Sequence, residues 1–392
     1  MNRKQFLSLL VVVVVLGAAG WLVRQRSSDS WHSGSLALGQ KLLPNLPVND
    51  VAQITIKSGA DQVNLARENN LWRVKERSDY PAAFSQISEL LLKLADLKVV
   101  QSEDVGPSQM SRFELLPPGT GSNTATSIEF KDQTGKSVGS LLLGKKHMKK
   151  AAGNPQFPGM GEEGWPDGRY VMTAPGAQSV ALISDPLDSV QTKADQWLNK
   201  DFLNVENPKS VAVQFPEATN SWKLTRASET NDWQLADAKA GEKLDSSKIS
   251  SVTSPLSSAS FNDVAPRATA SATGSNTVLT IETFDGFNYV ATVAPKKDDN
   301  YPVTLTLSAN LPTARVAAKD EKAEDKAKLD KDFATHQKTL TDKLAKEQGL
   351  TNWVYQLPGY SIEEILKTRS QLMEEASTNS AAPAATGSAP EK

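Results

Sequence analysis

The chain has 392 residues, of which 22% are charged, and its formal net charge is -2. This length is enough for about two or three domains with separate cores, and the charge gives no basic field that would indicate a nucleic-acid partner. Because there are no cysteines and three histidines, we expect no disulfide, no metal centre and no cofactor.

Residues 1–26 are predicted to be an N-terminal transmembrane anchor. Residues 6–23 carry no charge and are long enough to cross a bilayer, near the short end of the usual range. A cleaved signal peptide is the alternative, because residues 18–20 are small enough for a peptidase site. Basic residues lie on both sides of the span, so charge alone does not set its orientation.

A linker is predicted at residues 27–45, and the first folded domain at residues 46–207. The domain begins with alternating apolar residues of a strand, and the dipeptide Asn69-Asn70 marks the turn of a hairpin. An apolar stripe with helical spacing follows, which we expect to cover one face of the sheet. Its members are Phe84, Ile87, Leu90, Leu91, Leu94 and Leu97.

Much of this pattern occurs again in residues 208–375, which we predict to form a related second domain. One constant offset aligns residues 54–67 with residues 213–226, and the sequence of residues 120–124 recurs unchanged at 273–277. Alternating strands with tight turns argue against βαβ units, which need longer crossovers. The predicted fold is therefore α+β, with two tandem related domains that each have an antiparallel sheet and a covering helix.

The second domain contains an insertion at residues 315–348 that has no glycine or proline and is rich in alanine, lysine and acidic residues. It is predicted to be a long charged helix with opposite charges at favourable helical spacing. Its thin apolar stripe is not a firm heptad, so we expect the helix to project or to pack lightly. This pattern fits either a solvated helix or a helix that pairs two chains or docks on another subunit. The docking residues would be Leu329, Phe333, Leu340 and Leu344.

The C-terminal residues return the chain to the sheet and then leave it. Residues 353–357 alternate like a strand, and Ser361 with Glu364 has the spacing of a capping box for a last helix. Residues 376–392 consist mostly of alanine, serine, proline and glycine and are predicted to be disordered.

No group of residues predicts a catalytic site. Residues 139–145 fit the start of a phosphate-binding loop, but Lys146 stands where magnesium binding requires serine or threonine.

Eight tryptophans would allow a carbohydrate platform, yet Trp72 and Trp233 hold equivalent places in the repeat, which favours core packing. A basic cluster fits contact with anionic lipid or an acidic partner, although a solvated hairpin tip is favoured. The cluster surrounds His147 and comprises Lys145, Lys146, Lys149 and Lys150.

Four segments along the chain carry a family resemblance. They are the N-terminal span, residues 71–74, the Tyr80-Pro81 start of the leucine-rich helix, and residues 353–360. With them, most of residues 46–375 resembles the bacterial family described as domain of unknown function 4340. The resemblance implies a single-pass inner-membrane protein with its bulk in the periplasm or otherwise outside the cytoplasm. Such proteins are often encoded beside a gliding-motility-type or uncharacterised ABC transport system, and the family provides no catalytic residues to assign.

We therefore expect a non-enzymatic, membrane-anchored envelope protein that is an accessory subunit of an ABC-type transport or gliding-type complex. Its expected partners are the membrane and transporter subunits, with self-association through the long helix as an alternative. A cell-wall glycan-binding module is the first alternative function and would need an exposed aromatic ring, such as Trp31 or Trp165, beside a groove. An envelope hydrolase is the second and would need an acid–base pair in a pocket.

Overall fold

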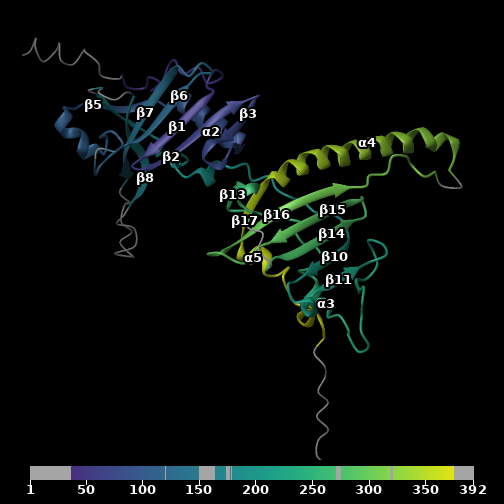
Figure 1. Cartoon of the computed structure of the whole chain (residues 1–392). Helices are drawn as coiled ribbons and strands as arrows, with labels where there is room; N and C mark the ends of the chain where they lie inside the picture. Colours follow the sequence, from purple (N-terminus) through teal and green to yellow (C-terminus); the bar gives the residue numbers. More distant parts are fainter. Residues whose placement is uncertain are drawn as a thin grey trace, which may run out of the picture. The chain divides into compact units, whose positions relative to one another are not determined.

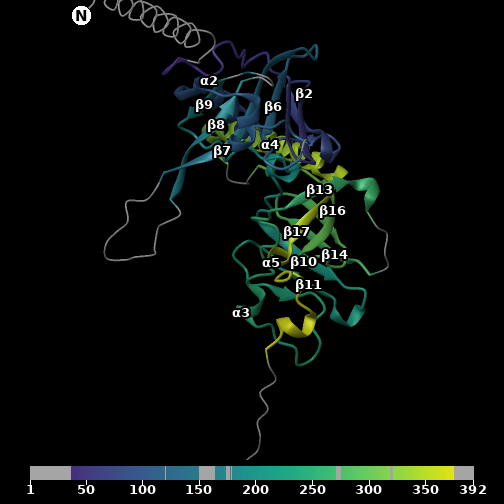
Figure 2. The same ribbon diagram turned by 90° about the vertical axis from the view of Figure 1, so that its left-hand side faces the viewer.

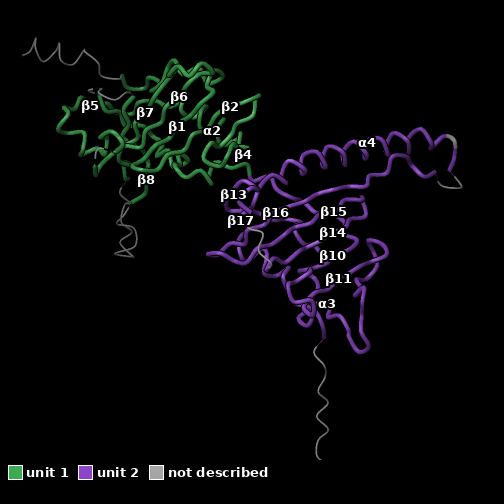
Figure 3. The backbone as a smooth tube through the Cα atoms, viewed as in Figure 1, with its two compact units in different colours: residues 1–199 green, residues 200–392 purple. Residues whose placement is uncertain are grey.

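A computed structural model describes residues 37–119, 121–149, 164–173, 177, 179–270, 275–317 and 321–374. The predicted anchor and the predicted disordered tail lie outside these residues. Within them, no helix has both the length and the apolar character needed to cross a membrane. The chain divides into two compact units, Met1–Asn199 and Lys200–Lys392 (Figure 3). Both have antiparallel sheets with few helices, which confirms the predicted α+β class.

Unit 1 is organised around one antiparallel sheet (Figure 1). Its strand order is β4-β3-β2-β1-β6-β7-β8-β9-β5. Side chains alternate between the two faces, so Ile54 and Ile56 are buried while their neighbours are more exposed. The strands are β1 (Gln53–Ser58), β2 (Asp61–Glu68), β3 (Leu71–Val74), β4 (Tyr80–Pro81), β5 (Val99–Asp104), β6 (Thr126–Lys131), β7 (Ser137–Lys149), β8 (Trp165–Met172) and β9 (Ser179–Ile183).

Helix α2 (Phe84–Asp96) is the longest helix in the described part of unit 1. Its apolar stripe is buried at Ile87, Leu90, Leu91 and Leu94, as the spacing predicted. Phe84 is an exception with 66% exposure, because it is the first residue of the helix and lies outside the buried stripe. The 3-10 turns of the unit are η1 (Lys75–Arg77), η2 (Pro107–Phe113) and η3 (Ala194–Trp197).

Part of the predicted linker belongs to unit 1. The Gly39 N–H donates to the Val99 carbonyl at 2.8 Å, and the Val99 N–H donates to Gln40 at 2.9 Å. Leu42 is buried, and its N–H donates to Leu97 at 2.8 Å. Residues 39–42 therefore extend the sheet beside the start of β5, and the linker predicted up to residue 45 ends earlier.

Unit 2 has a second antiparallel sheet, with the order β12-β11-β10-β14-β15-β16-β17-β13. It begins before the predicted boundary at 207/208, because the Lys200 ammonium donates to the carbonyls of Phe261 at 3.1 Å and Asn262 at 2.8 Å. The strands are β10 (Pro208–Gln214), β11 (Trp222–Thr225), β12 (Gln234–Leu235), β13 (Asp263–Pro266), β14 (Thr277–Thr283), β15 (Phe287–Val293), β16 (Asn300–Ala309) and β17 (Trp353–Pro358).

The two sheets have the same strand order once β4 is set aside. The constant offset inferred from the sequence is nevertheless wrong for the first strand. Leu65 pairs with Ile54, and its counterpart Leu224 pairs with Val211, so Ile54 corresponds to Val211 and not to Val213. Because side chains in a strand alternate with a period of two residues, a slip of two keeps every side chain on its face and leaves no trace in the apolar pattern.

The helices of unit 2 are unequal in length. They are α3 (Ser246–Ile249), α4 (Ala323–Gln348) and α5 (Gly359–Ile362), with the 3-10 turns η4 (Ala218–Asn220), η5 (Arg267–Thr269), η6 (Gly349–Asn352) and η7 (Arg369–Leu372). Helix α4 occupies most of the predicted insertion but begins later than residue 315. The last helix predicted from Ser361 is wrong, because Ser361 donates to the Pro358 carbonyl and the capping box is formed by Thr368 with Gln371.

Candidate binding site

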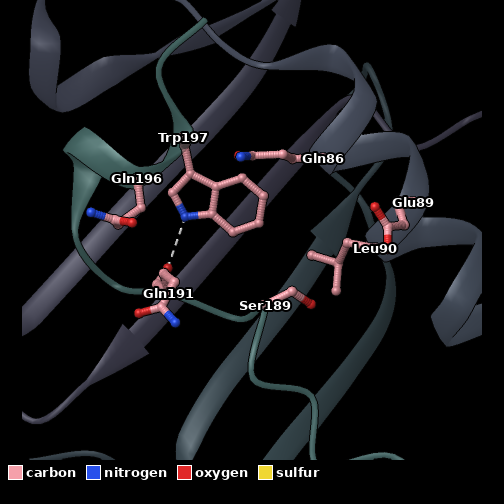
Figure 4. A pocket seen from close by; sticks show the side chains of 7 residues that line it. All are labelled: Gln86, Glu89, Leu90, Ser189, Gln191, Gln196 and Trp197. Atoms are coloured by element: carbon pink, nitrogen blue, oxygen red, sulfur yellow. Dashed lines mark hydrogen bonds between the residues drawn. The ribbon is translucent and has the colours of Figure 1, made fainter. Parts of the chain in front are cut away.

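A cavity of about 340 Å³ lies in unit 1 between α2 and the segment that follows β9 (Figure 4). Its volume is near the lower end of the range for small-molecule sites. Helix α2 and the 3-10 turn η3 with its preceding loop supply the lining residues, which are Gln86, Glu89, Leu90, Ser189, Gln191, Gln196 and Trp197.

Trp197 holds the two walls of the cavity together. Its indole N–H donates to the Gln191 carbonyl at 2.9 Å, which fixes the loop on one side (Figure 4). Its own carbonyl accepts from the Ala83 N–H at 2.8 Å, which ties η3 to the start of α2. Trp197 is only 2% exposed and Leu90 only 1%, so both are core residues that lie beneath the cavity and present little surface to it.

The rim of the cavity is polar and carries a single type of charge. Glu89 is the one carboxylate among the described lining residues, and none of them is basic. Lys93, one helical turn after Glu89, pairs instead with Asp185 at 3.2 Å. The side-chain amide of Gln191 donates to the backbone carbonyl of Asp188, and that of Gln196 donates to the Asp195 carboxylate. The side chains of Gln86, Glu89 and Ser189 form no hydrogen bond with another described residue, and all three are exposed to solvent.

This cavity does not supply what the alternative functions require. Glycan binding needs an exposed aromatic face, but the Trp197 ring is buried, and Trp165, which is 52% exposed, does not line the cavity. Trp31 lies outside the described residues. Hydrolysis by acid–base catalysis needs two titratable groups, whereas Glu89 stands alone here. No group of residues that could hold a metal ion occurs in the described part of the chain.

The predicted basic cluster lies on an extension of the sheet in unit 1. Strands β7 and β8 run beyond their neighbours there (Figure 2), and Lys149 pairs with Trp165 across them. Lys146 forms an ion pair with Asp188 at 2.5 Å, and His147 Nδ1 lies 2.6 Å from Asp167 Oδ1. Part of the cluster is therefore neutralised by acidic partners, while Lys150 lies outside the described residues. The segment that resembled a phosphate-binding loop is continuous strand within β7.

The two equivalent tryptophans differ in burial. Trp72 is 5% exposed and belongs to the core of unit 1, as predicted. Trp233 is only half-buried and packs against the Arg226 guanidinium, whose central carbon lies 4.9 Å from the ring centroid. The core assignment of Trp233 is therefore wrong. Trp72 lies within β3, whereas Trp233 precedes β12, which is only two residues long.

The four predicted docking residues of α4 are in different environments. Leu340 is buried at 6% exposure, and Phe333 and Leu344 are half-buried on the same helix face. Leu340 is therefore not free to dock on a partner, because it packs within its own unit. Leu329 is 39% exposed and remains accessible. The helix thus packs more firmly than expected over its C-terminal half.

A buried polar pair that the sequence analysis missed also holds α4. The Tyr289 hydroxyl donates to the Glu347 carboxylate at 2.8 Å. Burial raises the pKa of Glu347 above its ordinary value, and burial beside Glu347 also raises the pKa of Tyr289. The sequence does indicate that Glu347 faces inward, because it follows Leu340 and Leu344 at helical spacing.

Comparisons with known proteins give one family match. The model of the family described as "Domain of unknown function (DUF4340)" matches residues 160–277. This match confirms the resemblance seen in the sequence, although the segments that first indicated it lie outside the matched span. No curated protein and no solved structure matches the chain.

Proposed function

We propose that this DUF4340-type chain is a non-enzymatic, membrane-anchored envelope protein and an accessory subunit of an ABC-type transport or gliding-type complex. The family resemblance supports this class of partner. The uncharged residues 6–23 support a single inner-membrane anchor, with the folded units on the periplasmic side or otherwise outside the cytoplasm. In this function the two units bind other components and perform no chemistry.

The observation that carries the proposal is the N-terminal part of α4, whose surface its own sheet does not cover. Residues 324–332 are all exposed. The segment is nevertheless held in place, because the Arg315 guanidinium pairs with Glu321 and donates to Asp330 at 2.9 Å. A helix that is ordered before binding loses little conformational entropy on association, so it offers a partner a ready surface. Leu329 provides an apolar contact on this charged surface.

The proposal is tested by purifying the tagged full-length chain from native membranes and identifying its partners. We expect a subunit of a transport complex to co-purify, and we expect Leu329→Glu to abolish its recovery. Thr339→Glu is the matched control, because it places the same charge at an exposed position in the C-terminal half of α4. Recovery of only a second copy of this chain, or of no transporter subunit, would contradict the proposal.

A further inference from the structure

We infer that the outer part of the hairpin formed by β7 and β8 in unit 1 contacts an anionic lipid surface. We call this part the arm, and it comprises residues 145–149 and 165–169. The inference rests on the membrane anchor of the proposed function, because the anchor would hold unit 1 beside a bilayer. It needs no transporter subunit and uses no residue of α4.

The arm extends beyond the strands that flank it in the sheet. Strand β6 pairs with β7 only as far as Leu143, and β9 pairs with β8 only as far as Arg169. Within the described part of the chain, the strands of the arm therefore pair only with each other (Figure 2). Such a two-stranded ribbon can place side chains of both its faces against a surface that it meets end-on.

The arm carries two large apolar side chains that are open to solvent. Trp165 is 52% exposed and Met148 is 45% exposed. Trp165 pairs with Lys149, and Met148 pairs with Pro166, which is the next pair along the ribbon. Successive side chains of a strand point to opposite faces, so the indole ring and the thioether lie on opposite faces. Entry of the tip into the head-group region of a bilayer would cover both groups, and tryptophan is enriched at that depth.

The free charge of the arm is positive. Lys145 and Lys149 are exposed, and neither forms an ion pair with another described residue. Lys146, in contrast, pairs with Asp188 at 2.5 Å. Asp167, the one carboxylate among the described arm residues, lies 2.6 Å from the ring of the neighbouring histidine. The two free ammonium groups therefore suit anionic head groups, while the methylenes of Lys149 can lie along the apolar layer beside the ring.

The equivalent hairpin of unit 2, formed by β15 and β16, lacks these features. The Lys296 ammonium pairs with Glu363 at 2.8 Å, and the Gly359 N–H donates to the Asp299 carbonyl at 2.9 Å. Its turn, residues 294–299, has no exposed large apolar side chain. The hairpin of unit 2 is thus held by its own unit. An exposed tryptophan with free lysines is therefore a property of the arm and not of the shared strand order.

The chain enters unit 1 close to the base of the arm. The Gly39 N–H donates to the carbonyl of the first residue of β5 at 2.8 Å. One row of cross-strand partners leads from there to the arm, and its members are Val99, Ile183, Arg169 and Lys146. At about 4.8 Å between strands, this row spans roughly 15–20 Å.

The distance from the predicted anchor to unit 1 is also limited. Residues 24–36 separate the predicted span from the described fold and can extend at most about 45 Å. A chain tethered in this way meets its own membrane at a high effective concentration. A contact made by two lysines and two apolar side chains is therefore sufficient to hold the arm at the bilayer.

The test uses the full-length protein in lipid nanodiscs, with a fluorescent label on one introduced cysteine, because the chain has no cysteine of its own. Met148→Cys places the label on the arm, and Ser137→Cys places it at the exposed opposite end of β7. The discs contain phosphatidylcholine alone or with an equal part of phosphatidylglycerol, and a nitroxide lipid quenches any label that reaches the head-group region. We expect quenching of the arm label in the phosphatidylglycerol discs, weaker quenching in phosphatidylcholine, and none for the label at Ser137.

Variants of the arm-labelled protein then test the lysines and the ring. Lys149→Gln should lower the equilibrium constant of the contact about fivefold, and Lys145→Gln added to it roughly 25-fold in total, because each lysine near an anionic surface contributes about fivefold. Lys136→Gln is the matched control, since Lys136 is exposed at the other end of β7 and its loss should change nothing. Trp165→Ala should weaken the contact in both kinds of disc, because burial of the ring does not depend on lipid charge.

Co-elution of the protein with the discs tests the anchor separately, so failure of the anchor and failure of the arm contact are distinguishable. The inference would be overturned by an unquenched arm label, by equal quenching of the two labels, or by equal quenching in the two kinds of disc. Equal quenching of the Lys149→Gln and Lys136→Gln proteins would overturn it as well. None of these outcomes bears on the transporter partner, which the co-purification experiment tests.

Discussion

The two units share a sheet but differ in the helices that cover it. In unit 1 the helix between the hairpin and the later strands, α2, buries four apolar residues against the core. At the same place in unit 2, α3 is a single turn that buries only Ile249, and Pro255 would interrupt a helix as long as α2. The strand order is thus kept between the two units while the helical layer is replaced.

The replacement helix in unit 2 comes from a different connection and uses different forces. Helix α4 is inserted between β16 and β17, and contacts β16. It is held by Leu340 and by the buried bond between Tyr289 and Glu347 rather than by a continuous apolar stripe. Lys343 adds an ion pair with Glu206 at 2.9 Å. The covering helix of unit 2 is therefore attached partly by polar groups, whereas the covering helix of unit 1, α2, is attached by apolar burial.

The largest expected difference between the units concerns the equivalent tryptophans. Trp72→Ala should lower the free energy of unfolding of unit 1 by about 3–5 kcal/mol, because it leaves a cavity in the core. Trp233→Ala should cost unit 2 only about 1 kcal/mol, since it mainly removes a partly exposed contact with Arg226. Amide hydrogen exchange of each unit in the full-length protein measures both values. Equal losses would show that the half-buried position of Trp233 does not lower its contribution.

A smaller effect is expected at the polar attachment of α4. Tyr289→Phe should lower the free energy of unfolding of unit 2 by about 1–3 kcal/mol, because the buried Glu347 carboxylate loses its donor. Tyr360→Phe is the matched control; Tyr360 is 75% exposed, so the change should stay within about 0.5 kcal/mol. Chemical denaturation with hydrogen exchange of α4 distinguishes the two variants. Equal stability of the Phe variants would show that the Tyr289–Glu347 bond does not hold the helix.

The smallest predicted effect is a pH dependence of unit 2. The pKa of Glu347 is raised above its ordinary value of 4.5, so the folded state favours the protonated carboxyl. The stability from this group is present below pH 4.5 and is lost as the pH rises through the raised pKa. Glu347→Gln should remove this loss while keeping a hydrogen-bonding group at the site.

Hydrogen exchange of α4 as a function of pH measures the effect. Glu242 provides an internal contrast, because its hydrogen bonds with Arg369 lower its pKa to about 2. The stability that Glu242 contributes is therefore lost as the pH falls from 4.5 toward 2, whereas the stability from Glu347 is lost as the pH rises. A wild-type profile that matches the Glu347→Gln profile above pH 4.5 would contradict the assignment.

The fold class was predictable because it rests on local patterns. The stripe of α2 and the alternation in β1 show directly in the sequence, and both are found. The exact alignment of the first strands was not predictable, since a slip of two residues preserves the pattern. The last helix was predicted wrongly because the Ser361 hydroxyl donates to the Pro358 carbonyl, and the capping box is formed by Thr368 with Gln371. Residue spacing alone does not show which partner such a hydroxyl takes.

The candidate binding site was not predictable from the sequence. Glu89 and Ser189 are brought together by packing of segments far apart in the chain, and neither residue type has a local signature. Trp197 was recognisable only as a large aromatic residue. The docking residues of α4 were predicted from their helical spacing. Spacing cannot tell whether an apolar stripe faces the helix's own unit or a partner. Leu340 is buried within its own unit.

The position of β13 has a consequence for how unit 2 folds. This strand lies at the edge of the sheet beside β17, and Asp263 pairs with Gln356. During synthesis β13 emerges long before β17, with α4 made in between. Contacts between residues so distant in sequence form slowly, because a long loop must close first. The edge at β13 can therefore be completed only after β17 has been made, and until then the backbone groups of β13 can pair with another chain, which exposes this stage to aggregation.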